Sequence, residues 1–132
     1  MAHLIQKWEE IDMVPKAAST AIGVGEFLEY NGTGEVVPLN PTNEVVGLCL
    51  EEISSTDPDY TSIRKIPYQV ARGFKFVMSV TTGTATANDI GSTFDVDASN
   101  SAGLDVSGAG TQFVVREFIS GTLVVVEPIL LA

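Results

Sequence analysis

The stretch Arg-Gly-Phe-Lys-Phe-Val-Met-Ser-Val, residues 72–80, decides the fold class. Apolar side chains occupy every second position of it, at Phe74, Phe76, Met78 and Val80. A two-residue period is typical of a strand that buries one face. Similar short apolar runs, closed by Gly, Asn, Asp or Ser, recur from residue 24 to the C-terminus. The pattern predicts an all-β protein, a small antiparallel β-sandwich or barrel built of hairpins.

Length and charge narrow the class of protein further. The chain has 132 residues, of which 45% are hydrophobic, and this fits one globular domain with its own core. Seventeen acidic residues against seven basic ones give a net charge of -10. Such a charge repels phosphate backbones, so we expect no nucleic-acid partner. It also favours solubility of the free protein at high concentration.

The sequence gives no signal for a membrane or an oxidising compartment. Cys49 is the one cysteine, and its apolar neighbours predict a small buried side chain rather than a reactive thiol. The N-terminus carries charges and Trp8 where a signal peptide has an apolar segment. The apolar run from Leu123 is interrupted by Glu127-Pro128 and is too short to span a bilayer. We expect a protein that is made in the cytoplasm, is not secreted and does not contact membranes.

Residues 1–14 read differently from the rest and are predicted to form an N-terminal arm, with the β domain at residues 15–132. One stripe of a short helix would carry Leu4, Trp8 and Ile11. Pro15 would end that helix at about residue 14. Because so short a helix is stable only when it docks on another surface, two interpretations stay open. The arm either caps its own domain or reaches a neighbouring chain.

Turn residues divide the rest of the chain into strands. Asn31-Gly32 predicts a hairpin between strands at residues 26–30 and 35–39. Pro38 and Pro67 each predict an edge strand, or for Pro67 a bulge. Further strands are expected at residues 14–19, 44–53, 63–71 and 74–80, with a surface loop at 54–61. Two final hairpins are expected to pair 92–97 with 104–107 and 112–119 with 122–129.

The last hairpin is expected to supply much of the core. The side chains assigned to it are Val114, Phe118, Leu123, Val124, Val125, Val126 and Ile129. The run Val124-Val125-Val126 does not alternate, which predicts either a strand covered on both faces or an outward face that forms a subunit contact.

Residue types that carry chemistry are present, but their spacing does not assemble a site. Asp95, Asp97 and Asp105 lie on one predicted hairpin, where polar residues on the wet face are the simpler interpretation of the pattern. An EF-type calcium loop starting at Asp95 is excluded, because Asn100 stands where that loop needs glycine. His3 is the one histidine. We therefore expect no enzyme, no metal and no cofactor.

Aromatic side chains offer a weaker possibility, a groove for a ligand. The candidates are Trp8, Tyr30, Tyr60, Phe74 and Phe113. Aromatic residues of a small β domain are mostly core residues, and the sequence does not gather these five into one site.

The order of segments resembles the small capsid decoration, or cementing, proteins of tailed bacteriophages. The segments that carry the resemblance are 24–30, 45–50, 68–76, 84–97, 114–119 and 123–129. Within them, Asn88-Asp89-Ile90-Gly91 and Val114-Val115-Arg116-Glu117 match the family pattern well. Residues 1–14 have no fixed counterpart in the family.

The resemblance implies a non-enzymatic virion protein on the outer capsid surface. There it would clamp neighbouring subunits of the major capsid protein at three-fold positions, commonly as a homotrimer. The residues expected to bind the capsid or a neighbouring subunit lie in the arm, with Trp8 as anchor: Leu4, Lys7, Trp8, Ile11 and Met13. Alternative functions are a virion-surface module that binds glycans or the host, and a tail or connector component.

Overall fold

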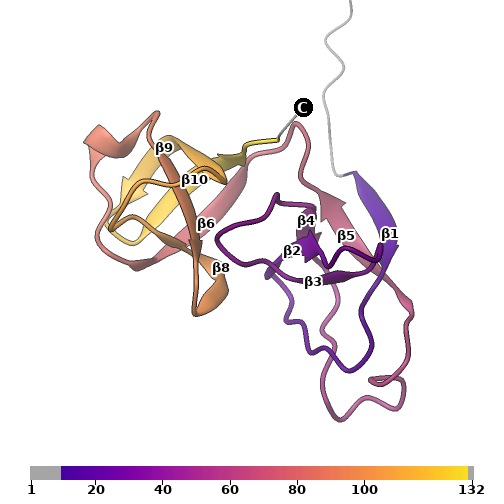
Figure 1. Ribbon diagram of the computed structural model, residues 1–132. Coiled ribbons are helices and arrows are strands. Elements are labelled where there is room, and N and C mark those ends of the chain that lie inside the picture. Colours follow the sequence, from indigo (N-terminus) through magenta and orange to yellow (C-terminus); the bar gives the residue numbers. More distant parts are fainter. Residues whose placement is uncertain (1–9, 131–132) are drawn as a thin grey trace, which may run out of the picture.

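The computed structural model describes residues 10–130 and consists almost entirely of β-strands (Figure 1). The first five strands form one sheet: β1 (Ile11–Pro15), β2 (Phe27–Tyr30), β3 (Val36–Pro38), β4 (Gly47–Cys49) and β5 (Lys65–Val70). Their order across the sheet is β1-β5-β4-β2-β3, with every neighbouring pair antiparallel. The predicted all-β class is confirmed.

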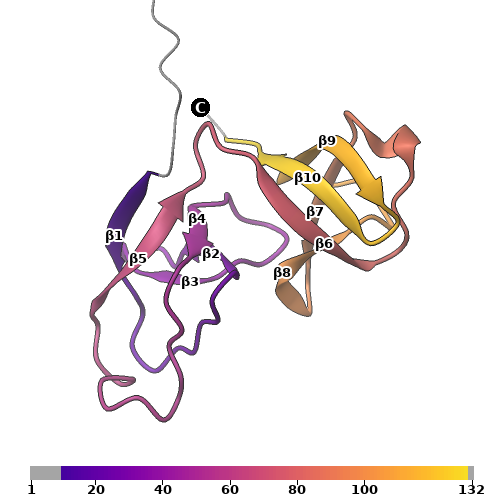
Figure 2. The ribbon, with the colours of Figure 1, turned by 180° about the vertical axis from the view of Figure 1, so that it is seen from behind.

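The second half of the described chain closes into a barrel. Its strands are β6 (Phe76–Thr82), β7 (Thr93–Asp97), β8 (Asn100–Asp105), β9 (Phe113–Ser120) and β10 (Leu123–Pro128). A single 3-10 turn, η1 (Ala87–Asp89), lies between β6 and β7. The β6–β8 pair is parallel, and the other barrel pairs are antiparallel. In Figure 2 the C-terminal strand β10 runs beside β6 and β9.

Turn chemistry explains the hairpins that the sequence predicted. β2 and β3 pair antiparallel across the Asn31–Gly34 turn, where Gly32 and Gly34 adopt φ values of 92° and 88°. Pro38 lies in β3 at an edge of the sheet, as predicted. The corresponding prediction for Pro67 is wrong, because β5 lies between β1 and β4. Proline lacks only the N–H donor, and the carbonyl of Pro67 still accepts a hydrogen bond from the Leu50 N–H at 3.2 Å.

The predicted helix is wrong over its last residues. Residues 11–15 form β1, which pairs antiparallel with β5 from Ile11 opposite Gln69 to Pro15 opposite Lys65. Pairing with β5 gives the backbone its hydrogen bonds and buries Val14, and a three-point helical stripe does not outweigh that gain. Residues 1–9 of the predicted helix lie outside the described residues.

The strand that decided the fold class behaves as the pattern predicted. Phe76, Met78 and Val80 of β6 are buried in the barrel core, whereas Val77 is 65% exposed. On β9 the predicted core positions are wrong by one residue, because Phe113 and Val115 are buried and Phe118 is exposed. On β10, Val124 and Val126 are fully buried and Val125 between them is partly exposed, so burial alternates along the strand and only one of its faces is fully buried.

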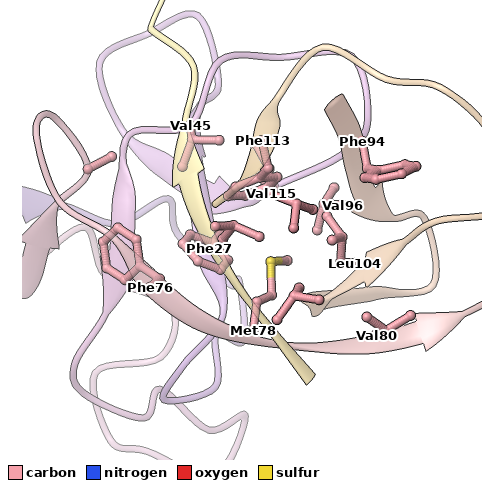
Figure 3. Close-up of a cluster of buried hydrophobic side chains, with 14 of the residues drawn as sticks. Phe27, Val45, Phe76, Met78, Val80, Phe94, Val96, Leu104, Phe113 and Val115 are labelled. Atoms are coloured by element: carbon pink, nitrogen blue, oxygen red, sulfur yellow. The ribbon is translucent and has the colours of Figure 1, made fainter. Parts of the chain in front are cut away.

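A shared core joins the sheet to the barrel (Figure 3). Phe27 projects from β2 into the barrel cluster and makes edge-to-face contacts with Phe76 and Phe113, with ring centroids 5.3 and 5.0 Å apart. Val45, from the loop before β4, lies in the same cluster. The other side of the sheet has its own apolar cluster around Leu28, Val36, Cys49 and Ile66.

Polar side chains hold the loop between β3 and β4 from both sides, and this loop reaches towards the barrel in both views (Figures 1 and 2). The buried Gln112, just before β9, donates from Nε2 to the carbonyls of Asn40 and Asn43 at 2.6 and 2.5 Å. Its Oε1 accepts the Val96 N–H at 2.9 Å. From the sheet side, the buried Glu29 carboxylate accepts the Asn40 N–H at 2.6 Å and the Asn43 side-chain amide. We call residues 40–43 with Glu29 and Gln112 the interlobe clamp.

Candidate functional site

The predicted partner-binding residues divide between described and undescribed positions. Leu4, Lys7 and Trp8 lie outside the described residues. Ile11 and Met13 lie on β1, where they are 54% and 50% exposed. Because they are two residues apart on a strand, they project from the same face of the sheet.

These two side chains form a short apolar strip together with Pro67 on the neighbouring strand. Met13 lies opposite Pro67 on β5, and Ile11 lies opposite Gln69. Gln69 in turn lies opposite Leu48, and Leu48 opposite Phe27, so this row of residues belongs to one face. The barrel core covers the β2–β4 part of that face. On the β1–β5 part Gln69 is buried and Pro67 is partly exposed, while Ile11 and Met13 are about half exposed. We call Ile11, Met13 and Pro67 the β1 strip.

The carboxylates of the β7–β8 hairpin accept hydrogen bonds that hold neighbouring turns and strands in place. Asp97 is buried, contrary to the wet-face interpretation, and accepts hydrogen bonds from the Thr81 and Thr82 hydroxyls at 2.7 and 2.6 Å. Its other oxygen accepts the Ser99 N–H and hydroxyl. These bonds hold the Asp97 pKa well below its usual range, so this carboxylate is unsuited to general acid–base catalysis.

The two other aspartates of the hairpin also accept hydrogen bonds from neighbouring residues. Asp95 accepts the backbone N–H groups of Thr111 and Gln112, and Asp105 accepts the N–H and hydroxyl of Ser107. Each therefore fixes a turn next to its strand. Within residues 10–130 no group of three or more His, Cys, Asp or Glu side chains is placed to hold a metal ion.

Within residues 10–130 one basic side chain, that of Lys16, is fully buried. Lys16 donates from Nζ to the carbonyls of Ala17, Tyr60 and Ser62 at 3.2, 3.0 and 2.7 Å, and Nζ lies 5.8 Å from the Tyr60 ring centroid. The side chain thereby fastens the loop at residues 54–62 to the sheet. This role belongs to the fold and was not predicted from the sequence.

Cys49 is buried, as predicted. Its thiol donates to the Glu51 carbonyl at 3.0 Å, and burial raises its pKa. A raised pKa lowers the fraction of thiolate, which is the reactive form.

The aromatic candidates are separated in the structure. Phe113 is in the core, and Phe74 packs against its edge. Tyr60 donates its hydroxyl to the Ser19 carbonyl at 2.8 Å beside Lys16. Trp8 lies outside the described residues. Tyr30 lines a pocket.

That pocket, with a volume of about 520 Å³, lies where the sheet meets the chain leading to the barrel. Tyr30 and Tyr68 form one wall, and Val45, Val46, Val70 and Leu130 supply apolar surface. Asn43, Glu44 and Arg72 complete the lining. Sequence reasoning missed Tyr68, because the mixed alternation of β5 did not show which of its faces would be buried.

Comparisons with known proteins do not assign the chain. No protein-family model matches it, and no curated protein matches it significantly. Across residues 10–130 there is no helix of the length and apolar character needed to cross a membrane. The function must therefore be argued from the β1 strip, the pocket and the charge.

Proposed function

We propose that this protein is a virion structural protein that binds the outer surface of a bacteriophage capsid and clamps neighbouring major capsid subunits. The observation that carries the proposal is the β1 strip. Ile11 and Met13 are half exposed on an edge strand, and both belong to the arm, residues 1–14, that the sequence predicts to bind a partner. An edge strand with an apolar face is a surface on which another chain can dock.

A small contact surface such as the β1 strip is sufficient for a protein that binds a shell of many identical subunits. A single strip of this size gives a modest contact, but a capsid presents many copies of it. A protein that binds only the assembled shell stabilises that shell by mass action. The net charge of -10 keeps unassembled copies apart in solution. A homotrimer at three-fold positions, as the resemblance implies, would let three β1 strips act together.

Capsid binding tests the proposal. Decoration-free capsids of the phage would be mixed with the purified protein, sedimented, and imaged by electron cryomicroscopy. We expect saturable binding to the outer surface and a higher temperature of capsid disruption. Density at the tail or connector alone would favour the alternative structural role and reject capsid decoration.

Two matched variants test the surface. Met13→Glu places a charge in the β1 strip and should weaken capsid binding at least tenfold while leaving the thermal unfolding of the free protein unchanged. Val24→Glu changes a side chain that is 63% exposed and lies outside the strip, and it should bind normally. Equal binding by both variants would show that the β1 strip is not the contact surface.

A further inference from the structure

The pocket beside Tyr30 has features that the capsid contact does not use. Its volume of about 520 Å³ lies within the usual range for small-molecule sites. Tyr30 is 52% exposed although its ring is large and apolar, and Tyr68 beside it is almost fully buried. The Tyr30 phenol lies close enough to the Tyr68 phenol to raise the Tyr68 pKa, after the larger effect of burial. The result is a fixed aromatic wall that faces solvent on one side.

The opposite part of the lining is held by the interlobe clamp. The Asn43 carbonyl accepts from Gln112, and its side-chain amide donates to the buried Glu29. Val45, two residues further on, is anchored in the barrel core. A pocket whose walls are fixed before a ligand arrives loses little conformational entropy on binding.

Side chains of both charges lie around the pocket, so its lining is complementary neither to a simple anion nor to a simple cation. Asp12 and Glu10 lie close enough to Tyr68 to raise its pKa, after the larger effect of burial, and Glu44 lines the pocket itself. These carboxylates disfavour an anion. The Arg72 guanidinium in the same lining disfavours a cation. Glu44 and Arg72 both take part in interactions within the protein. A carboxylate can accept, and a guanidinium can donate, several hydrogen bonds at once.

We propose that this pocket binds a neutral pyranose sugar. A pyranose ring has an apolar C–H face that can lie on Tyr30, and hydroxyl groups that match the Asn43, Glu44 and Arg72 side chains at the rim. The valines and Leu130 cover the remaining apolar surface. The inference is independent of capsid decoration, since it uses a different part of the sheet from the β1 strip.

Binding is tested with the full chain in solution. Methyl glycosides of glucose, galactose, mannose, N-acetylglucosamine and N-acetylgalactosamine would be titrated to tens of millimolar and followed by NMR, alongside a glycan array. Tetramethylammonium and inorganic phosphate serve as probes for a cation or an anion site. We expect at least one sugar to cause saturable shifts at Tyr30, Tyr68 and Val46. A response to a free glycoside indicates a monosaccharide site, and a response confined to the array indicates a longer glycan.

Two substitutions make the result specific. Tyr30→Ala removes an exposed ring and should weaken sugar binding at least tenfold without unfolding the protein. Val24→Ala changes an exposed side chain that is not part of the pocket lining, and this variant should bind as the unsubstituted protein does. The proposal is overturned if no sugar binds, if only tetramethylammonium or phosphate shifts these signals, or if Tyr30→Ala binds normally. Contacts between the Tyr30 ring and residues 1–9 or 131–132 in the free protein would also overturn it.

Discussion

Replacing Gln112 with alanine tests whether the interlobe clamp contributes to stability. The substitution removes three hydrogen bonds, with the Val96 N–H and the carbonyls of Asn40 and Asn43. Val96 is 1% exposed, so its N–H loses its acceptor in a place that water reaches poorly, at a cost of about 1–3 kcal/mol. Asn40 and Asn43 are exposed residues, and water can replace much of what their carbonyls lose. We expect a loss of roughly 2–4 kcal/mol, most of it from Val96.

Urea unfolding followed by circular dichroism measures this loss. The m-value should stay constant, because both states expose the same surface as before. Asn88→Ala, at an exposed position of η1, is the matched control and should change the free energy of unfolding by less than about 0.5 kcal/mol. If Gln112→Ala also loses less than about 0.5 kcal/mol, the clamp does not stabilise the protein as argued.

A second substitution tests the acceptor role of the Gln112 side chain separately from its donor role. Gln112→Glu keeps an oxygen for the Val96 N–H but turns a carboxylate towards the carbonyls that the amide nitrogen served. We expect it to be at least as destabilising as alanine at pH 7. Part of the loss should be recovered on acidification, when the protonated carboxyl group can donate again.

Three further predictions follow from buried groups. Lys16→Met should lower the free energy of unfolding by about 1–3 kcal/mol, because three carbonyls lose their donor. It should also speed amide hydrogen exchange within residues 54–62, and unchanged exchange there would contradict the role of Lys16. The pKa of Asp97 in the folded protein lies below its ordinary value of 3.8, so its contribution to folding stability is present above that pH and is lost as the pH falls further. Asp97→Asn should therefore make stability less dependent on pH in the acid range, as measured by urea unfolding at several pH values. Phe27→Ala should cost about 3–5 kcal/mol, against a much smaller loss for the exposed Phe118→Ala, and equal losses in calorimetry would contradict its place in the shared core.

Local patterns in the sequence were sufficient for much of the fold. The alternation over Phe76, Met78 and Val80 identified a half-buried strand, and Asn31-Gly32 identified a hairpin. Both signals act between near neighbours in the chain. The β9 core positions failed, because alternation alone does not say which of two alternating sets faces inward, and Val114 and Val115 are the same residue type.

Long-range pairing accounts for what the sequence did not reveal. Residues 11–15 look helical until β5 is available as a partner fifty or more residues away. Lys16 looks like a surface residue, because its three acceptors come from segments that only the fold brings together. The pocket depends in the same way on Tyr30 and Tyr68 meeting across the sheet. Ile11 and Met13 were identified as candidate contacts, although on a helix rather than a strand.

The closed order of the barrel has a consequence for synthesis on the ribosome. β10, the last of the described strands, pairs with both β6 and β9, so the ring is incomplete until residue 128 has emerged from the exit tunnel. The sheet needs only residues 11–70 for its own pairing and can assemble earlier. Until β9 has emerged, however, the Phe27 ring has no Phe113 to pack against and stays open to chaperones.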